Sequence, residues 1–135
     1  MIDVSASDEV GVDLAALEEI VTWCLGRLGV AEASVGLMVV GPERMRAINS
    51  EHRGVDRPTD VLAFPVDGPD AAAWPDGAPP PELGDVVICP DAAEEPLTTL
   101  AVHGLLHLLG HDHETDDGAM LALQDELVGA ARGER

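Results

Sequence analysis

Lysine is absent from this chain of 135 residues, and its seven arginines stand against 26 acidic residues, which gives a formal net charge of −19. A large basic surface for nucleic acid needs clustered cations, so any binding of nucleic acid has to be local or assisted by a partner. The chain also lacks an apolar run of about eighteen residues and a basic segment followed by an apolar one. We therefore expect a cytoplasmic protein without a membrane span or a signal peptide.

Cysteine is scarce as well, with Cys24 on the apolar stripe of a predicted helix and Cys89 at the end of a predicted strand. Their spacing is neither that of a zinc ribbon nor that of a redox motif, so we interpret both as buried, reduced thiols. The length and the apolar fraction of 46% predict a single domain over residues 1–135 with a sizeable core.

Hydrophobic periodicity divides the chain into strands and helices. Alternating or continuous apolar runs predict strands over residues 2–4, 33–40, 60–64 and 83–90. Apolar residues that recur at three and four positions predict helices over residues 14–28, 42–48, 97–109 and 120–128. Asp13 is the expected N-cap of the first helix, and Gly29 follows its end. Residues 66–82 hold five prolines and predict an extended surface loop.

The most informative stretch is His-Gly-Leu-Leu-His-Leu-Leu-Gly-His-Asp-His, residues 103–113. His103 and His107 are four residues apart, so on a helix their imidazoles share one face and can bind one ion. Gly110 can adopt the left-handed conformation that ends a helix, and the reversal can return His113 as a third ligand. Three histidines leave the fourth position of a tetrahedral zinc ion open to water. We therefore predict a catalytic zinc site, with other divalent metals as alternatives, rather than ordinary buried histidines.

The spacing His-x3-His-x2-Gly-x2-His is that of the metzincin proteases, but Gly104 replaces the glutamate that follows their first histidine. A peptidase would therefore need a different general base. His111 is either a fourth ligand or, as we favour, exposed to solvent or in contact with a ligand. Asp60 and Asp85 either orient a ligand histidine or a water molecule, or form caps and turns.

The histidine stretch is one of three blocks that together resemble the YbeY family. The second is Asn-Ser-Glu-His-Arg-Gly-Val-Asp-Arg-Pro-Thr-Asp-Val-Leu-Ala-Phe-Pro, residues 49–65, and the third is Leu-Gly-Asp-Val-Val-Ile-Cys-Pro, residues 83–90. His52 stands in place of the family's aromatic residue, Ala63 in place of its serine and His111 in place of its usual tyrosine. Members of this family are metal-dependent endoribonucleases of bacterial ribosomal RNA maturation.

The resemblance implies an α+β fold with a small, mostly four-stranded sheet, packed helices and the histidine helix across one face, as in a zincin-like metal site. It implies a zinc ion on His103, His107 and His113, and catalytic roles for Arg53 and His107. Arg53 would face the metal cleft, where a guanidinium fork suits phosphate. Arg57 has at most a contact with the RNA backbone. The segment that precedes the histidines is shorter than in most relatives by about three helical turns, which affects substrate preference and partner docking.

The predicted function is a metal-dependent, single-strand-specific endoribonuclease in 16S rRNA 3′ end maturation and ribosome quality control. The ion would activate a water molecule and polarise a phosphoryl oxygen, while Arg53 stabilises the charge on phosphorus; the general base is not assigned. The expected partners are single-stranded rRNA and the small ribosomal subunit, reached through a ribosomal protein or an Era-like GTPase, with no DNA and no membrane. The alternatives are a zinc-dependent peptidase and a non-catalytic, ribosome-associated metal-binding protein.

Overall fold

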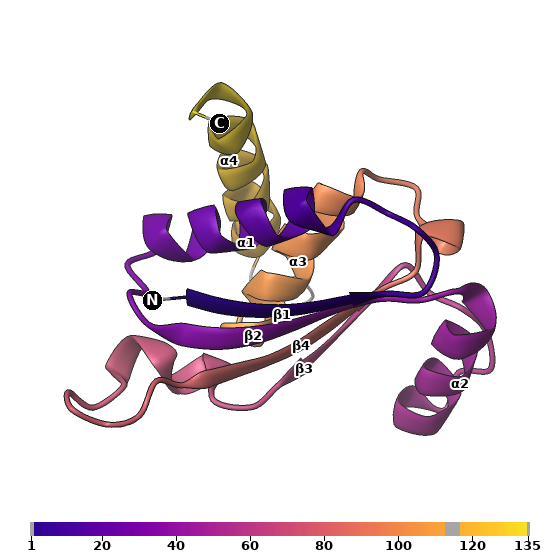
Figure 1. The fold of residues 1–135 in the computed structure, drawn as a ribbon, viewed down its shortest axis with the longest axis horizontal. Coiled ribbons are helices and arrows are strands. Elements are labelled where there is room, and N and C mark those ends of the chain that lie inside the picture. Colours follow the sequence, from indigo (N-terminus) through magenta and orange to yellow (C-terminus); the bar gives the residue numbers. More distant parts are fainter. Residues whose placement is uncertain (1, 113–116, 135) are drawn as a thin grey trace.

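Four strands form one mixed sheet in the computed structural model, which describes residues 2–112 and 117–134 (Figure 1). The strands are β1 (Ile2–Asp8), β2 (Ala33–Val39), β3 (Val61–Pro65) and β4 (Glu82–Ile88). Their order across the sheet is β1-β2-β4-β3, in which β1, β2 and β4 run parallel and β3 pairs antiparallel with β4 at the edge. The predicted α+β class and four-stranded sheet are confirmed.

Helices cover both faces of this sheet. The α-helices of the described residues are α1 (Leu14–Arg27), α2 (Pro42–Arg53), α3 (Leu97–Leu108) and α4 (Ala119–Glu134). Figure 1 shows α1, α3 and α4 on one side of the sheet and α2 on the other. The larger core lies under α1, α3 and α4, and a smaller cluster joins Met45 of α2 to Leu62 and Val87. No helix in the described part of the chain is long and apolar enough to cross a membrane.

Local signals in the sequence account for the limits of α1. The Asp13 carboxylate accepts a hydrogen bond from the backbone N–H of Ala15 at 3.1 Å, as expected of an N-cap. Gly29 follows the helix with a φ of +82°, which a residue without a Cβ adopts at little cost. Both predictions are confirmed, and α1 then packs on β1, α3 and α4.

Helix α3 lies very close to the centre of the sheet because Gly104 faces β4. A Cβ atom at this position would lie 2.5 Å from Val86 Cγ1, well inside the usual separation of about 3.5–4.0 Å between carbon atoms. Both Gly104 and Val86 are buried. Apart from its two histidines and its ends, α3 is buried on all sides, which makes it a core helix with a narrow polar stripe.

Residues 66–82 form more than the extended surface loop that the sequence predicts. They contain a short 3-10 helix, η1 (Gly68–Ala73), that packs against the end of α3. Gly68 lies against the carbonyl group of Leu108, so that a side chain there would collide with the backbone. The backbone N–H of Asp67 donates to the Glu82 carbonyl at 2.8 Å, and its carboxylate accepts from the Glu82 N–H at 3.0 Å, which closes the loop at its base. These long-range contacts cannot be read from the local composition of proline and alanine.

Candidate metal centre

Two imidazoles converge on the polar stripe of α3. His103 and His107 are both partly buried, and their Nε2 atoms lie 3.2 Å apart. The rings meet edge to face, with centroids 4.8 Å apart and an angle of 74° between their planes. Two nitrogen ligands of a tetrahedral zinc ion, each about 2.0–2.1 Å from the metal, would lie about 3.3–3.4 Å apart. The geometry of the pair therefore fits one divalent ion held by two Nε2 atoms.

A glutamine from α4 completes the surroundings of His103. Gln124 Oε1 lies 2.7 Å from His103 Nδ1, and the glutamine is only 6% exposed. Gln124 was not among the residues predicted for the site. A signal was present, because Gln124 lies on the apolar stripe that also contains Met120, Leu127 and Val128, where a polar side chain needs a buried partner.

The chain reverses after α3 as predicted. Gly110 has a φ of +97°, and its N–H donates to the His107 carbonyl at 3.0 Å. The next N–H, of His111, donates to the Leu106 carbonyl at 3.0 Å, and the two bonds together end the helix as a Schellman motif. The predicted left-handed glycine is confirmed.

The predicted third ligand, His113, lies outside the described residues, so its role stays a prediction. Within residues 2–112 and 117–134, no group of three or more metal-ligating side chains gathers. His111 lies on the wall of a cavity of about 770 Å³, together with Trp74 and Leu109. Its assignment to solvent or to the surroundings of a ligand also stays a prediction.

A buried contact explains why Gly104 follows the first histidine. Because the position points at Val86, α3 could not carry a glutamate there and keep its distance from β4. Asp85, the neighbour of Val86 along the strand, points to the opposite face and is exposed. Asp60 binds locally, since its carboxylate accepts the Val61 N–H at 2.8 Å. Neither aspartate forms a hydrogen bond or ion pair with His103 or His107 in the described structure.

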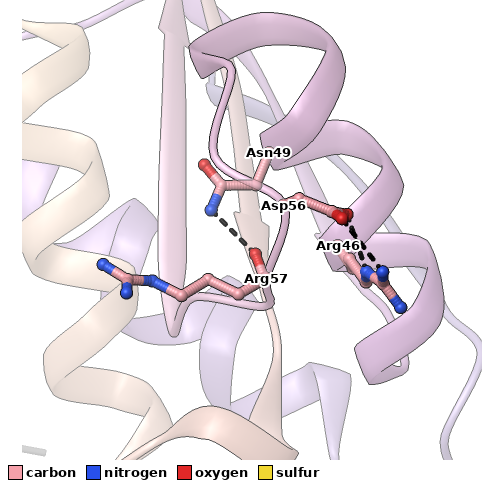
Figure 2. A network of polar contacts seen from close by, with 4 residues as sticks. All are labelled: Arg46, Asn49, Asp56 and Arg57. Atoms are coloured by element: carbon pink, nitrogen blue, oxygen red, sulfur yellow. Dashed lines mark hydrogen bonds and ion pairs between the residues drawn. The ribbon is translucent and has the colours of Figure 1, made fainter.

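The loop after α2 is tied to that helix by polar contacts (Figure 2). Arg46 donates from Nε and Nη2 to the two carboxylate oxygens of Asp56, at 2.8 and 3.0 Å. Asn49 is 1% exposed, and its Nδ2 donates to the Arg57 carbonyl at 2.9 Å. The hydrogen bond from Arg46 and its positive charge lower the pKa of Asp56 below the ordinary value for an aspartate. The loop that follows Gly54 is therefore attached to α2 at two points, Asp56 and Arg57.

Two arginines of the region have no side-chain partner among the described residues. Arg44 pairs with Glu9 at 3.5 Å, and Arg46 is neutralised by Asp56. The guanidinium groups of Arg53 and Arg57 are exposed and make no hydrogen bond or ion pair with any residue that the structure describes. Figure 2 shows the Arg57 side chain extending away from α2. In a strongly acidic chain, these two cations remain available to a phosphate.

The fold and the site define an α+β protein with paired histidines on a buried helix and an exposed arginine loop. The family model described as endoribonuclease YbeY matches residues 4–131, and the chain belongs to this family.

Relatives and a solved structure agree with this assignment. The chain is 35% identical over 156 residues to endoribonuclease YbeY of Salinispora tropica, covering 99% of this chain and 98% of that protein. It is 34% identical over 139 residues to endoribonuclease YbeY of Wolinella succinogenes, and the match covers 95% of this chain and 89% of that protein. A match to that of Bradyrhizobium diazoefficiens is 42% identical over 112 residues and covers 73% of this chain but 61% of the relative. The solution structure of a Thermotoga maritima protein is 27% identical, with a TM-score of 0.59 over 99% of this chain and 91% of that one.

Proposed function

We propose that this protein is a zinc-dependent endoribonuclease that cuts single-stranded ribosomal RNA during 3′ maturation of the small-subunit rRNA and during ribosome quality control. The observation that carries the proposal is the pair of Nε2 atoms 3.2 Å apart on α3, in a chain of the YbeY family. When bound, the ion would activate a water molecule and polarise a phosphoryl oxygen.

The residues of the chain have separate roles in this proposal. His103, His107 and His113 hold the ion. Arg53 donates hydrogen bonds to the phosphate oxygens that gain charge during attack, because a guanidinium has a rigid fork of donors. Arg57 contacts the RNA backbone. The ion pair between Arg46 and Asp56 holds the loop between them and removes one negative charge from the vicinity of the phosphate.

The charge of the chain limits how RNA binds. With a net charge of −19 and only a few unpaired arginines, the protein cannot follow a long duplex through many phosphate contacts. A short, single-stranded segment needs fewer contacts. Delivery of the RNA by the small ribosomal subunit, through a ribosomal protein or an Era-like GTPase, would supply the remaining affinity.

Two rival functions use the same histidines. A zinc peptidase is disfavoured, because Gly104 packs on Val86 and leaves no space for a general base at that position. A non-catalytic metal-binding protein would need the ion to hold its fold. This role is disfavoured because α1, α3 and α4 bury a continuous apolar cluster against the sheet, which gives the fold a core of its own side chains.

The decisive experiment measures cleavage of an end-labelled, single-stranded fragment from the 3′ region of small-subunit rRNA. Zinc-reconstituted wild type is compared with His107→Ala, Arg53→Ala and Arg132→Ala, the last being an exposed arginine on α4 that serves as a control. We expect cleavage by the wild type and by Arg132→Ala, and none by His107→Ala. Arg53→Ala should be slower by about 10²–10³-fold, the typical effect of removing one donor to a developing charge.

Each rival has its own outcome. Equal cleavage by wild type and His107→Ala would show that the activity is not that of the metal site. Cleavage of an unstructured polypeptide that is lost in His107→Ala would favour a peptidase. Loss of most of the helicity on chelation, with no turnover of any RNA, would favour the binding protein.

A further inference from the structure

The contact between Gln124 and His103 joins two helices that also pack through apolar side chains. Gln124 belongs to α4 and His103 to α3, and the two helices contact each other directly. At 2.7 Å the distance between Oε1 and Nδ1 is short for a nitrogen–oxygen hydrogen bond. The glutamine is 6% exposed, so water competes little for this contact.

The chemistry of the two atoms determines where the proton lies. An amide carbonyl oxygen only accepts hydrogen bonds, so His103 Nδ1 has to donate. A neutral imidazole carries one N–H group, and a proton on Nδ1 leaves a lone pair on Nε2. This Nε2 atom is the one that lies 3.2 Å from His107 Nε2. The glutamine thus selects the tautomer of His103 in which the nitrogen beside His107 can bind an ion.

We propose that Gln124 is a positioning residue that keeps His103 in the Nδ1–H tautomer, with Nε2 ready to bind a metal ion. The inference deepens the proposed function, because it rests on the metal site proposed above. A buried acceptor behind a ligand histidine also restrains the rotation of the ring, and loss of such a partner typically weakens metal binding by about 10–100-fold.

Two substitutions separate positioning from packing. Gln124→Met keeps the length of the side chain and removes the acceptor, whereas Gln124→Glu keeps an acceptor at the same place. Leu127→Met, at another buried position on the same face of α4, is the control for disturbance of the helix. Zinc affinity is measured by competition with a chelator, and thermal unfolding reports whether each variant is folded.

The tautomer is measured directly by long-range ¹H–¹⁵N correlation spectra of the metal-free protein. His103 is assigned by comparison with His103→Asn. We expect the Nδ1–H form in the wild type and in Gln124→Glu, and a mixture in Gln124→Met. Zinc affinity should fall by about 10–100-fold in Gln124→Met, and should be near that of the wild type in Gln124→Glu and Leu127→Met.

Either of two results would overturn the inference. The first is an Nε2–H tautomer of His103 in the metal-free wild type, a measurement that needs no variant to fold. The second is wild-type zinc affinity in a folded Gln124→Met protein. Neither readout depends on RNA, so a wild type that fails to cleave RNA would count against the proposed function and leave the role of Gln124 to be decided by these measurements.

Discussion

Replacement of Gly104 by alanine tests the close approach of α3 to the sheet. The added methyl group would lie 2.5 Å from Val86 Cγ1 and 3.0 Å from Cγ2. Val86 is 0% exposed, and its β-branched side chain has few alternative rotamers. Either the valine leaves its rotamer or α3 moves away from β4, and the histidines on α3 move with it.

The magnitude follows from two opposing effects. Overpacking a well-packed core typically costs about 1–3 kcal/mol, and an overlap with two carbon atoms belongs to the upper part of that range. Alanine is more favourable than glycine inside a helix by about 1 kcal/mol. We therefore expect a net loss of about 1–2 kcal/mol in the free energy of unfolding. Zinc affinity should decrease as well if α3 moves, because His103 is then displaced from Gln124 on α4, the residue proposed to position its ring.

Urea unfolding followed by circular dichroism measures this loss. The matched control is Gly129→Ala in the interior of α4, where an added Cβ would meet no atom within 4 Å beyond its chain neighbours and the backbone of its own helix. That variant should be stabilised by about 0.5–1 kcal/mol. In a double-mutant cycle, Val86→Ala should relieve most of the cost of Gly104→Ala. Equal stabilisation by Gly104→Ala and Gly129→Ala would refute the close contact.

Three further predictions concern the arginine loop and the end of α3. If Arg53 and Arg57 neutralise two phosphates, a plot of the logarithm of RNA affinity against the logarithm of salt concentration should have a slope of about −1.4. The slope should be about −0.7 in Arg57→Ala. Both are measured by fluorescence anisotropy in proteins that also carry His107→Ala, so that the RNA is not cleaved. Arg46→Gln should return the lowered pKa of Asp56 toward its ordinary value, as measured by NMR titration, because the hydrogen bond and the positive charge that lower it are removed. Since the folded pKa of Asp56 is lowered, the ion pair supports the loop above about pH 4 and its contribution is lost as the pH falls through the lowered value. Gly110→Ala should cost about 1–2 kcal/mol in unfolding experiments, because its φ of +97° is unfavourable for a residue with a Cβ, and it should also weaken zinc binding.

Each of these predictions has a control. Arg132→Ala, remote from the arginine loop in sequence, should leave the salt dependence unchanged, and a slope much steeper than about −3 would show that other cations bind the RNA. An unchanged pKa of Asp56 in Arg46→Gln would contradict the assigned cause. Gly29→Ala has a similar backbone conformation at the end of α1, with a φ of +82°. It should lose stability like Gly110→Ala but keep zinc affinity, and an equal loss of zinc affinity in both would be evidence against a specific role for the turn.

Local physics made several elements predictable from the sequence. The limits of α1 follow from a capping aspartate and a glycine after the last turn, and α3 follows from its apolar periodicity and Gly110. The apolar run over residues 83–90 also predicted a strand, and β4 is buried on both faces at Val86, Val87 and Ile88. These features depend on neighbours within a few residues along the chain.

Long-range contacts were not predictable in the same way. Nothing in the local sequence indicates that β4 lies between β2 and β3, or that η1 packs on the end of α3. The first strand is also longer than its two apolar residues suggested, because all of Ile2–Asp8 pairs with β2. At the candidate site, the spacing of His103 and His107 predicted their convergence. The partner of His103 was not predictable, because Gln124 lies on another helix, twenty-one positions further along the chain.

The dependence of His103 on α4 also sets an order of events during synthesis. A ribosome releases α3 before α4, so the nascent chain presents both histidines of α3 while the buried acceptor behind one of them has not yet been made. The acceptor for His103 Nδ1 reaches its place only when α4 folds onto α3. Under the role proposed above for Gln124, a chain synthesised only as far as α3 has its two histidines but lacks the residue that positions one of them.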